Sequence, residues 1–319
     1  MSYQWPVPRS PLVSRHIYNF WVLSEELHFA RAAEALEITT GQLSKDIKEL
    51  ETIFKTKLFT RANRQTKLTI AGKNLQHHMI PIMACAAQMH RAIEALESGV
   101  GGRIAIAING SAAGSPLTAD FLRQCFRRRS EYIISIVQKE LADQIWGLQH
   151  GRVDAGLVCS PSSDPMGYQS LYRTYKLWSE PAAVAMNSSN PLAKQDVVRV
   201  IEPAWGPLIV VGEPDEGGGA LAELNEVLKT TTSTRCHLEC GAGTELLLTR
   251  VASGNGLGLL SKSHAATINR AEVVIRPLDI GTLRMTTYLI TGISFSPEHI
   301  RRFLSTAKEI ASKDKRKAS

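Results

Sequence analysis

Two helical patterns near the N-terminus are separated by a very short break, which restricts the possible folds more than any other feature. Apolar residues recur at helical spacing on both sides: Phe29, Ala32, Ala33 and Leu36 before it, then Leu43, Ile47, Leu50 and Phe54. The break, Glu37-Ile38-Thr39, is too short for antiparallel neighbours and suits helices that cross steeply, as in a helix-turn-helix. A further helix around residues 17–23 should precede the pair, capped by Ser14.

The second helix of the pair should begin just after Thr39. Thr39 with Gln42 three residues later matches the capping box, in which each side chain bonds the other residue's backbone N–H. Helical geometry places the following residues opposite the apolar stripe or on its flanks: Gly41, Gln42, Ser44, Lys45, Lys48 and Thr52. This face carries short polar groups near the helix start and lysines beyond it.

Positive charge is concentrated around this helix. The chain has a net charge of +7, and residues 40–73 contain eight Lys or Arg residues against three acids. Such a one-sided excess indicates a surface that faces a polyanion. After the helix, two strand-like pairs and the polar tip between them predict a basic wing: Leu58-Phe59 and Lys67-Leu68, with Arg61, Asn63 and Arg64 between. Thr69 should cap the helix that follows.

The helix and the wing together contain the groups that binding to duplex DNA requires. Lysines and arginines hold phosphates, and short polar side chains near the start of a helix reach base edges. The residues predicted to contact DNA are Thr39, Thr40, Gln42, Ser44, Lys45, Lys48, Arg61 and Arg64.

At this point the chain resembles the LysR-type transcriptional regulators of bacteria. The matching positions, between about residues 14 and 73, are Phe20, Phe29, Ala32-Ala33, Leu36, Leu43-Ser44, Ile47, Leu50-Glu51, Leu58-Phe59, Arg61 and Leu68-Thr69-x-Ala71-Gly72. The recognition segment departs from the family, which usually has Ser-Gln-Pro-Ala at the turn and Arg after the Leu-Ser pair. This chain has Thr39-Thr40-Gly41-Gln42 and then Lys45. The resemblance implies a sequence-specific regulator rather than an enzyme, and the departures concern its base preference.

A heptad pattern follows the wing over residues 73–97. Its apolar positions alternate spacings of four and three: Leu75, Met79, Ile82, Ala86, Met89, Ile93 and Leu96. Such a seam is typical of a helix that packs against a partner helix, and it predicts a homodimer through this linker. The alternative is that the helix packs on its own domain. Pro81 should kink the helix or delay its start. The resemblance implies the same dimer, and a homotetramer built from it.

Beyond residue 103, short apolar strands alternate with helices, which predicts an α/β domain with a parallel sheet. Strands are expected at 104–108, 133–137, 153–158, 182–186, 208–211, 257–260, 273–275 and 283–290, and helices at 117–128, 141–149, 245–253 and 297–310. The layout resembles the family's two-lobed, periplasmic-binding-protein-like effector domain.

The predicted organisation has three parts. These are a winged helix-turn-helix DNA-binding domain at 1–73, a linker and dimerisation helix at 74–98, and an effector-binding domain at 99–319. Lobe I of the last domain should span about 103–161 and 269–319, and lobe II about 162–268.

Ligands of α/β sheets gather beyond the carboxyl ends of strands, and helix N-termini there attract anions. Ser115, followed by Pro116, should cap a helix that begins after the first strand of the sheet. The candidate effector-binding residues are Ser111, Ser115, Ser160, Glu213 and Thr244. A carboxylate would suit such a site, and the resemblance implies a small-molecule effector between the lobes.

Other chemistry finds little support in the sequence. Residues 254–260, GNGLGLL, are preceded by a helix rather than a strand, which argues against a dinucleotide site. The nine histidines form no ligand motif, and Cys236 and Cys240 lack a second ligand pair, so we expect no metal, cofactor or catalysis. The odd number of cysteines fits free thiols, and no apolar run could span a bilayer, so a cytoplasmic protein is expected.

Two alternatives remain open from the sequence. The chain could be an α/β enzyme or solute-binding protein whose N-terminus only oligomerises. It could also bind DNA through its N-terminus while the second half serves only for assembly.

Overall fold

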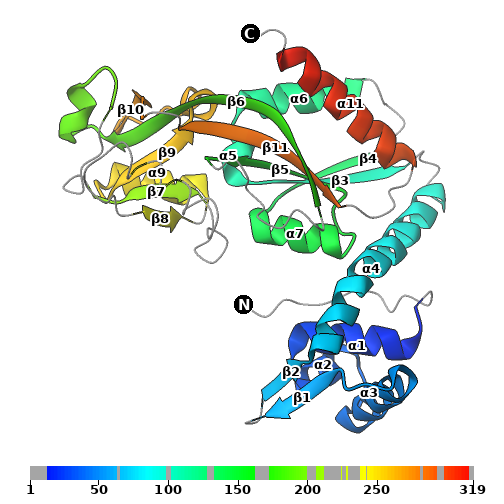
Figure 1. Cartoon of the computed structure of the whole chain (residues 1–319). Coiled ribbons are helices and arrows are strands. Elements are labelled where there is room, and N and C mark those ends of the chain that lie inside the picture. The colour runs from blue at the N-terminus through cyan, green and yellow to red at the C-terminus, as the bar shows by residue number, and fades with distance from the viewer. Residues whose placement is uncertain are drawn as a thin grey trace. The chain divides into compact units, whose positions relative to one another are not determined.

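The computed structural model describes residues 13–62, 65–97, 102–127, 133–161, 172–199, 206–211, 224, 228, 238–241, 243–280, 283–292 and 298–315 (Figure 1). The chain forms two compact units, residues 1–91 with 149–151, and residues 92–148 with 152–319. Of the helices in the described part of the chain, none is long and apolar enough to cross a membrane.

The first unit contains a winged helix-turn-helix. Three helices, α1 (Arg15–Glu26), α2 (Phe29–Ala35) and α3 (Thr40–Phe54), are followed by an antiparallel hairpin of β1 (Phe59–Ala62) and β2 (Gln65–Leu68). Their shared core is apolar because each helix turns one stripe inward; its most deeply buried members include Phe20, Trp21, Leu23, Leu43 and Leu58.

The predicted stripe of the recognition helix is confirmed except at its end. Leu43, Ile47 and Leu50 are buried, whereas Phe54 is 44% exposed. Phe54 is the last residue of α3, and Lys55 then takes a left-handed conformation with φ 51°, so the chain turns away before Phe54 is covered.

The turn between α2 and α3 has the hydrogen bonds of a Schellman motif. The backbone N–H of Glu37 donates to the carbonyl of Glu34, and that of Ile38 donates to the carbonyl of Ala33. Glu37 adopts the left-handed φ of 55° that this motif requires. The motif satisfies the last carbonyls of α2 within three residues, which is how so short a break can join two crossing helices.

The helix α4 (Ile70–Glu97) is continuous through Pro81, so the predicted late start is wrong. Thr69 caps it as expected, because its Oγ1 accepts the N–H of Gly72 at 3.0 Å. Ser14 also stands at its predicted N-cap position, but among the described contacts its side chain makes no capping hydrogen bond.

The predicted heptad seam divides into two parts along α4. Met79 is 1% exposed and Leu75 packs beside it, so these residues belong to the core of the helix-turn-helix. Ile82, Met89 and Ile93 are 51%, 47% and 53% exposed. The start of the seam therefore packs on its own domain, as the alternative interpretation held. Ala86 is also buried, at 6% exposed, while Ile82, Met89 and Ile93 face outward.

The second unit is built on a nine-stranded sheet in the order β4-β3-β5-β11-β6-β9-β7-β8, with β10 paired to β6 (Figure 1). The strands are β3 (Arg103–Ile108), β4 (Ile133–Gln138), β5 (Ala155–Ser160), β6 (Tyr172–Asn187), β7 (Leu208–Val211), β8 (Leu238–Gly241), β9 (Leu257–Ser261), β10 (Val273–Leu278) and β11 (Arg284–Gly292). The prediction of a parallel sheet is wrong in part. β3, β4 and β5 are parallel, as are β7, β8 and β9, but β6 and β11 run antiparallel to their neighbours.

The long strand β6 joins the two lobes of this unit. Residues 172–181 of β6 pair with β11, while residues 182–187 pair with β10, and part of that second segment also pairs with β9. The partner changes at Pro181, which has no N–H to donate to a ladder. Figure 1 shows β6 and β11 arching together from one lobe to the other.

Helices cover both faces of the first lobe. In Figure 1, α6 (Pro116–Arg127) and α11 (Glu298–Lys315) lie on one side of β3, β4 and β5, and α7 (Leu141–Gln149) lies on the other. The second lobe has α9 (Thr244–Ala252). Three short segments were not predicted because each is barely one turn long: α5 (Gly110–Ala113), α10 (Lys262–Ala265) and the 3₁₀ helix η1 (Pro191–Lys194).

The described cysteines Cys85, Cys125 and Cys159 are free thiols, as predicted. Burial raises the pKa of the Cys159 thiol to about 12, so this thiol stays protonated and behaves as a core residue. Cys240 lies in β8, and Cys236 is outside the described residues.

Candidate nucleic-acid interface and effector site

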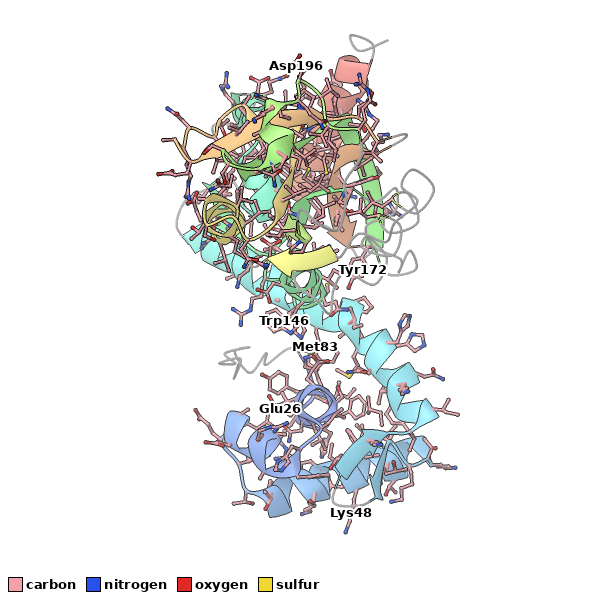
Figure 2. The ribbon with its side chains drawn as sticks, turned by 90° about the vertical axis from the view of Figure 1, so that its left-hand side faces the viewer. Glu26, Lys48, Met83, Trp146, Tyr172 and Asp196 are labelled. Atoms are coloured by element: carbon pink, nitrogen blue, oxygen red, sulfur yellow. The ribbon has the colours of Figure 1, made fainter. Side chains whose placement is uncertain are left out.

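The outer face of α3 presents four of the eight residues predicted to contact DNA. Thr40, Lys45 and Lys48 are exposed, and Ser44 is half-buried on the flank. Figure 2 shows Lys48 projecting from the outer side of this unit. The buried stripe on the opposite face fixes the helix, so these side chains point away from the core.

The start of α3 is capped, but the predicted capping box is only half formed. Thr39 Oγ1 accepts the backbone N–H of Gln42 at 3.1 Å, as expected. The side chain of Gln42 does not return to Thr39; its Nε2 donates to Asp46 Oδ1 at 2.7 Å. The carboxylate one turn along the helix is a charged acceptor, and a hydrogen bond to it is stronger than one to a neutral group.

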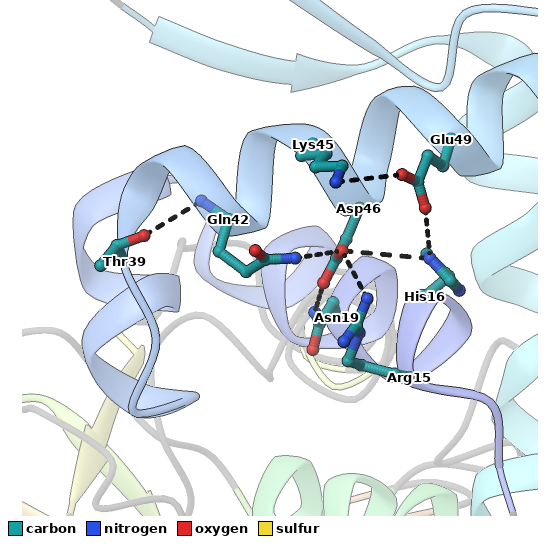
Figure 3. A network of polar contacts seen from close by, with 8 residues as sticks. All are labelled: Arg15, His16, Asn19, Thr39, Gln42, Lys45, Asp46 and Glu49. Atoms are coloured by element: carbon teal, nitrogen blue, oxygen red, sulfur yellow. Dashed lines mark hydrogen bonds and ion pairs between the residues drawn. The ribbon is translucent and has the colours of Figure 1, made fainter.

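Asp46 is the centre of a polar network between α1 and α3 (Figure 3). Its side chain is fully buried, and it accepts hydrogen bonds from Arg15 Nη2 at 3.2 Å and Asn19 Nδ2 at 2.7 Å as well as from Gln42. Asp46 was not among the residues predicted from the sequence. Helical geometry gives a signal, because it places Asp46 about 40° from Leu50, at the edge of the buried stripe.

A second polar contact lies one turn further along α3. Glu49 Oε2 is 2.7 Å from His16 Nε2, and its Oε1 is 4.0 Å from Lys45 Nζ (Figure 3). His16, Asp46 and Glu49 together place one possible metal-ligating atom each within 4.8 Å of one another. The sequence spacing gave no sign of this group because His16 comes from a different helix.

The wing is attached to α3 through Glu51. Its Oε1 accepts the backbone N–H groups of Leu58 at 2.9 Å and Phe59 at 3.4 Å, and its Oε2 pairs with Lys57 Nζ at 2.7 Å. Burial raises the pKa of Glu51, but the hydrogen bonds from Lys57 and the two N–H groups outweigh it and leave the pKa below its ordinary value. The carboxylate therefore stays ionised and fixes where β1 begins.

The hairpin itself is formed as predicted, with Arg61 of β1 opposite Thr66 of β2. The side chain of Arg61 and the whole of Arg64 lie outside the described residues.

Burial of the acids makes this surface more positive than the sequence count suggests. Of the three acids between residues 40 and 73, Asp46 and Glu51 are buried and Glu49 is exposed. Six lysines of the same segment are exposed: Lys45, Lys48, Lys55, Lys57, Lys67 and Lys73. The resulting field attracts a polyanion such as duplex DNA.

Asn109 organises the predicted effector residues of the first lobe. It caps α5 by accepting the N–H of Ala112, and it exchanges hydrogen bonds with the backbone N–H and carbonyl of Cys159. The end of β3 is thereby joined to the end of β5, which brings Ser111 toward the edge where Ser160 lies. Ser111 and Ser160 are both buried.

Ser115 caps α6 as predicted, but its hydroxyl is also used in a bridge between the lobes. Its Oγ accepts the N–H of Leu117 at 3.2 Å and lies 2.7 Å from Oγ of Ser263. Ser263 also donates its N–H and its hydroxyl to Glu180 of β6, at 2.7 and 2.8 Å. Ser115 is therefore a buried member of a chain of hydrogen bonds rather than an open ligand group.

A histidine of the second lobe packs directly on the first. A Cβ atom added to Gly114 would lie 2.0 Å from Nε2 of His264, so only glycine leaves room for this ring. Burial lowers the pKa of His264, although a hydrogen bond to the Ser111 backbone and the charge of Glu245 act to raise it. His264 is therefore neutral at neutral pH.

Thr244, at the start of α9, lies against the first turn of α5. A Cβ atom on Gly110 would be 3.4 Å from each of three polar atoms, Thr244 Oγ1, Gln138 Nε2 and Glu140 Oε1. The N–H of Gly110, at the start of α5, donates to Glu140 Oε1 at 3.0 Å. Ser111, Ser115 and Thr244 thus gather where the lobes meet, and Glu213 lies outside the described residues.

Comparison with family models covers most of the chain. Residues 14–73 match the bacterial regulatory helix-turn-helix protein of the lysR family, and residues 97–311 match the LysR substrate binding domain. The HTH-type transcriptional regulator XapR of Escherichia coli (strain K12) is 31% identical over 259 residues, which cover 81% of this chain and 85% of XapR. IlvR of Caulobacter vibrioides, also an HTH-type transcriptional regulator, is 29% identical over 278 residues, covering 83% and 87%.

Solved structures share the fold at lower sequence identity. The LysR family transcriptional regulator CbnR has a TM-score of 0.60 and 15% identity, with 93% of this chain and 98% of CbnR covered. Full-length CbnR in complex with its target DNA gives a TM-score of 0.59 at 16% identity, covering 93% and 99%. The BenM effector binding domain with its effector benzoate gives 0.50 at 18% identity, covering 67% of this chain and 94% of that domain.

Proposed function

The chain belongs to the LysR family of transcriptional regulators, and on that premise we propose that α3 and the wing bind an operator while the second unit binds a small-molecule effector between its lobes. The family pairs a helix-turn-helix DNA-binding domain with a substrate binding domain, and both are matched here.

One observation supports the DNA-binding assignment above all others. In the basic segment that contains α3, Asp46 and Glu51 are buried, and lysines cover the outside. We assign Thr40 and Ser44 to base edges, because they lie nearest the helix start on its outer face. Lys45 suits a guanine edge or a phosphate. Lys48 with Arg61 and Arg64 of the wing are assigned to phosphates, and Thr39 to fixing the start of the helix.

We assign the effector to the junction of α5 and α9. Thr244 is the first residue of α9, and the N-cap before it is Gly243, which provides no side-chain hydrogen bond. Thr244 Oγ1 is buried and has no hydrogen-bond partner among the described residues. A helix N-terminus with an unused hydroxyl suits a carboxylate, and BenM, a similar protein, was solved with benzoate. The assigned residues are Ser111, Ser160, Thr244 and, outside the described part, Glu213.

We further propose a cytoplasmic homodimer through the linker helix, which assembles into a homotetramer. The exposed Ile82, Met89 and Ile93 support the dimer, because spacings of seven and four place them on one face of α4. The proposed domain limits are 1–73, 74–98 and 99–319, with lobe I at about 103–161 and 269–319 and lobe II at about 162–268. The two family matches support the outer limits.

The proposed function is tested with the purified full-length chain and a library of randomised duplexes. Repeated selection should enrich a defined sequence, and addition of benzoate or other small carboxylates should raise the melting temperature of the wild type but not of Thr244→Ala. Enrichment of no sequence would contradict the operator assignment. An equal thermal shift in Thr244→Ala would contradict the effector assignment.

A further inference from the structure

Two pairs of polar side chains face each other between α1 and α3 (Figure 3). Arg15 and Asn19 are four residues apart on α1, and Gln42 and Asp46 are four residues apart on α3, so each pair occupies one face of its helix. Three of these side chains donate to the fourth, the carboxylate of Asp46, at 2.7 to 3.2 Å.

The burial of Asp46 restricts the position of α3 relative to α1. Its side chain is fully buried and Asn19 is 1% exposed, so neither can exchange its partner for water without movement of the helices. A buried carboxylate that loses a donor keeps its desolvation penalty, and so alternative positions of α3 are disfavoured. Oδ1 is bound by Gln42 and Arg15 and Oδ2 by Asn19, which fixes the carboxylate in orientation as well as in depth.

The same network engages a residue that sequence position alone would assign to DNA. Gln42 is at the third position of α3, where side chains of a recognition helix commonly meet base edges. Its backbone N–H is bound by Thr39 and its side-chain amide by Asp46, so its donors are directed along the helix and toward α1.

We propose that Asp46 is a positioning residue that fixes the recognition helix on α1 and withdraws Gln42 from base reading. Base reading then depends on Thr40, Ser44 and Lys45. The inference rests on the proposed role of α3 in DNA binding and goes beyond it, because it states which polar residue of the helix does not touch a base and why.

A metal site is the competing interpretation of the same cluster. His16, Asp46 and Glu49 have suitable ligand atoms, but two cations of the chain already lie against these carboxylates. Arg15 is 3.2 Å from Asp46 and Lys45 is 4.0 Å from Glu49. A divalent ion would have to displace Arg15 or Gln42 from Oδ1 and would stand beside Lys45, so the geometry favours the internal network.

The test uses the full-length chain and the duplex that the wild type enriches from a randomised library, together with every single-base-pair change of that duplex. Gln42→Ala removes the candidate base contact but leaves Asp46 two donors. It should lower affinity by less than about threefold and leave the base preference at every position unchanged. If Gln42 contacted a base directly, its loss would instead reduce the affinity difference between the correct and a changed base pair about tenfold or more, at one position only.

Asp46→Asn keeps the size of the side chain but places an amide against amide donors. We expect its preference for the enriched duplex over a scrambled one to fall about tenfold, spread over several positions. Adding Gln42→Ala to Asp46→Asn should have no further effect on the preference, because the Gln42 side chain acts only through its bond to Asp46. Circular dichroism of the variant establishes that the helices are retained.

Glu49→Gln is the matched control, since it also removes one negative charge from α3. It should raise affinity for enriched and scrambled duplexes by a similar factor and leave the preference unchanged. A change in preference at one base pair in Gln42→Ala would overturn the inference. So would a normal preference in Asp46→Asn, or loss of wild-type specificity in EDTA that zinc restores, which would establish the metal site. If the wild type enriched no sequence, the proposed function would fail instead.

Discussion

The carboxylate of Glu51, on the last turns of α3, lies 2.9 Å from the backbone nitrogen of Leu58, just before the first strand of the wing. This bond helps to connect the two elements that are proposed to bind DNA. Because Lys57 and Phe59 also donate to Glu51, the position of the wing depends on one ionised side chain.

Glu51→Gln should loosen the wing at neutral pH. The pKa of Glu51 is lowered in the folded protein, so its stabilising effect is present above the ordinary pKa and is lost as pH falls through the folded value. We expect local opening to become easier by about 1–3 kcal/mol, the cost of an impaired buried hydrogen bond. Hydrogen exchange of α3 and wing peptides measures this, with Glu49→Gln as control. Equal protection of wild type and Glu51→Gln at pH 7 would refute it.

Glu25→Gln should have the opposite effect. Burial raises the pKa of Glu25, the hydrogen bond from Gln76 lowers it in part, and the charge of Glu26 raises it further. The ionised form is therefore disfavoured in the folded protein, and the contribution of Glu25 to stability improves as pH falls through the raised pKa. At pH 7 the amide should raise the melting temperature of the full-length chain, and this gain should shrink at acid pH. A lower melting temperature of Glu25→Gln at pH 7 would contradict this, because it would show that the ionised carboxylate of Glu25 stabilises the folded protein.

Gly114→Ala should disturb the contact between the lobes of the second unit. The new Cβ would lie within 2.3 Å of three atoms of the His264 ring, and the overpacking should cost about 1–3 kcal/mol. His264→Ala removes the obstacle, so the double variant should be more stable than the sum of the two single effects predicts. Thermal unfolding of the three variants measures the coupling. Strict additivity would mean that the ring and the glycine are not in contact.

Ile82→Glu with Ile93→Glu should prevent dimerisation through the linker. Both side chains are about half exposed in the single chain, and a partner helix would have to bury the two unpaired charges. Light scattering should report a loss of mass relative to the wild type. Ile70→Glu is the control, because Ile70 is 82% exposed at the start of the same helix. An intact dimer of the double variant would exclude this seam as the interface.

Local patterns in the sequence were sufficient for much of the fold. The residues of α7 and β7 match the predicted limits, since an apolar period or run marks each of them clearly. The first half of β6 was missed because residues 172–181 contain no continuous apolar run. The antiparallel course of β6 and β11 depends on pairing between distant segments, which a local pattern does not specify.

The residues of the candidate sites also fall into two groups, those that a local pattern positions and those whose role depends on distant contacts. Thr39, Lys45 and Lys48 lie where helical geometry placed them, because a single helix determines their positions. The roles of Gln42 and Ser115 were altered by partners distant in the sequence: Gln42 bonds an Asp46 that Asn19 and Arg15 hold in place, and Ser115 meets Ser263. Such contacts depend on tertiary packing, and only the structure reveals them.

The most direct test of DNA reading by α3 is a titration of three alanine variants against the enriched and scrambled duplexes at several salt concentrations. Lys48→Ala should weaken both duplexes alike and reduce the salt slope by about one. Thr40→Ala and Ser44→Ala should weaken the enriched duplex by about 1–3 kcal/mol and leave the scrambled one and the salt slope unchanged. If all three variants lost affinity equally for both duplexes, α3 would be a phosphate clamp and would not read the sequence.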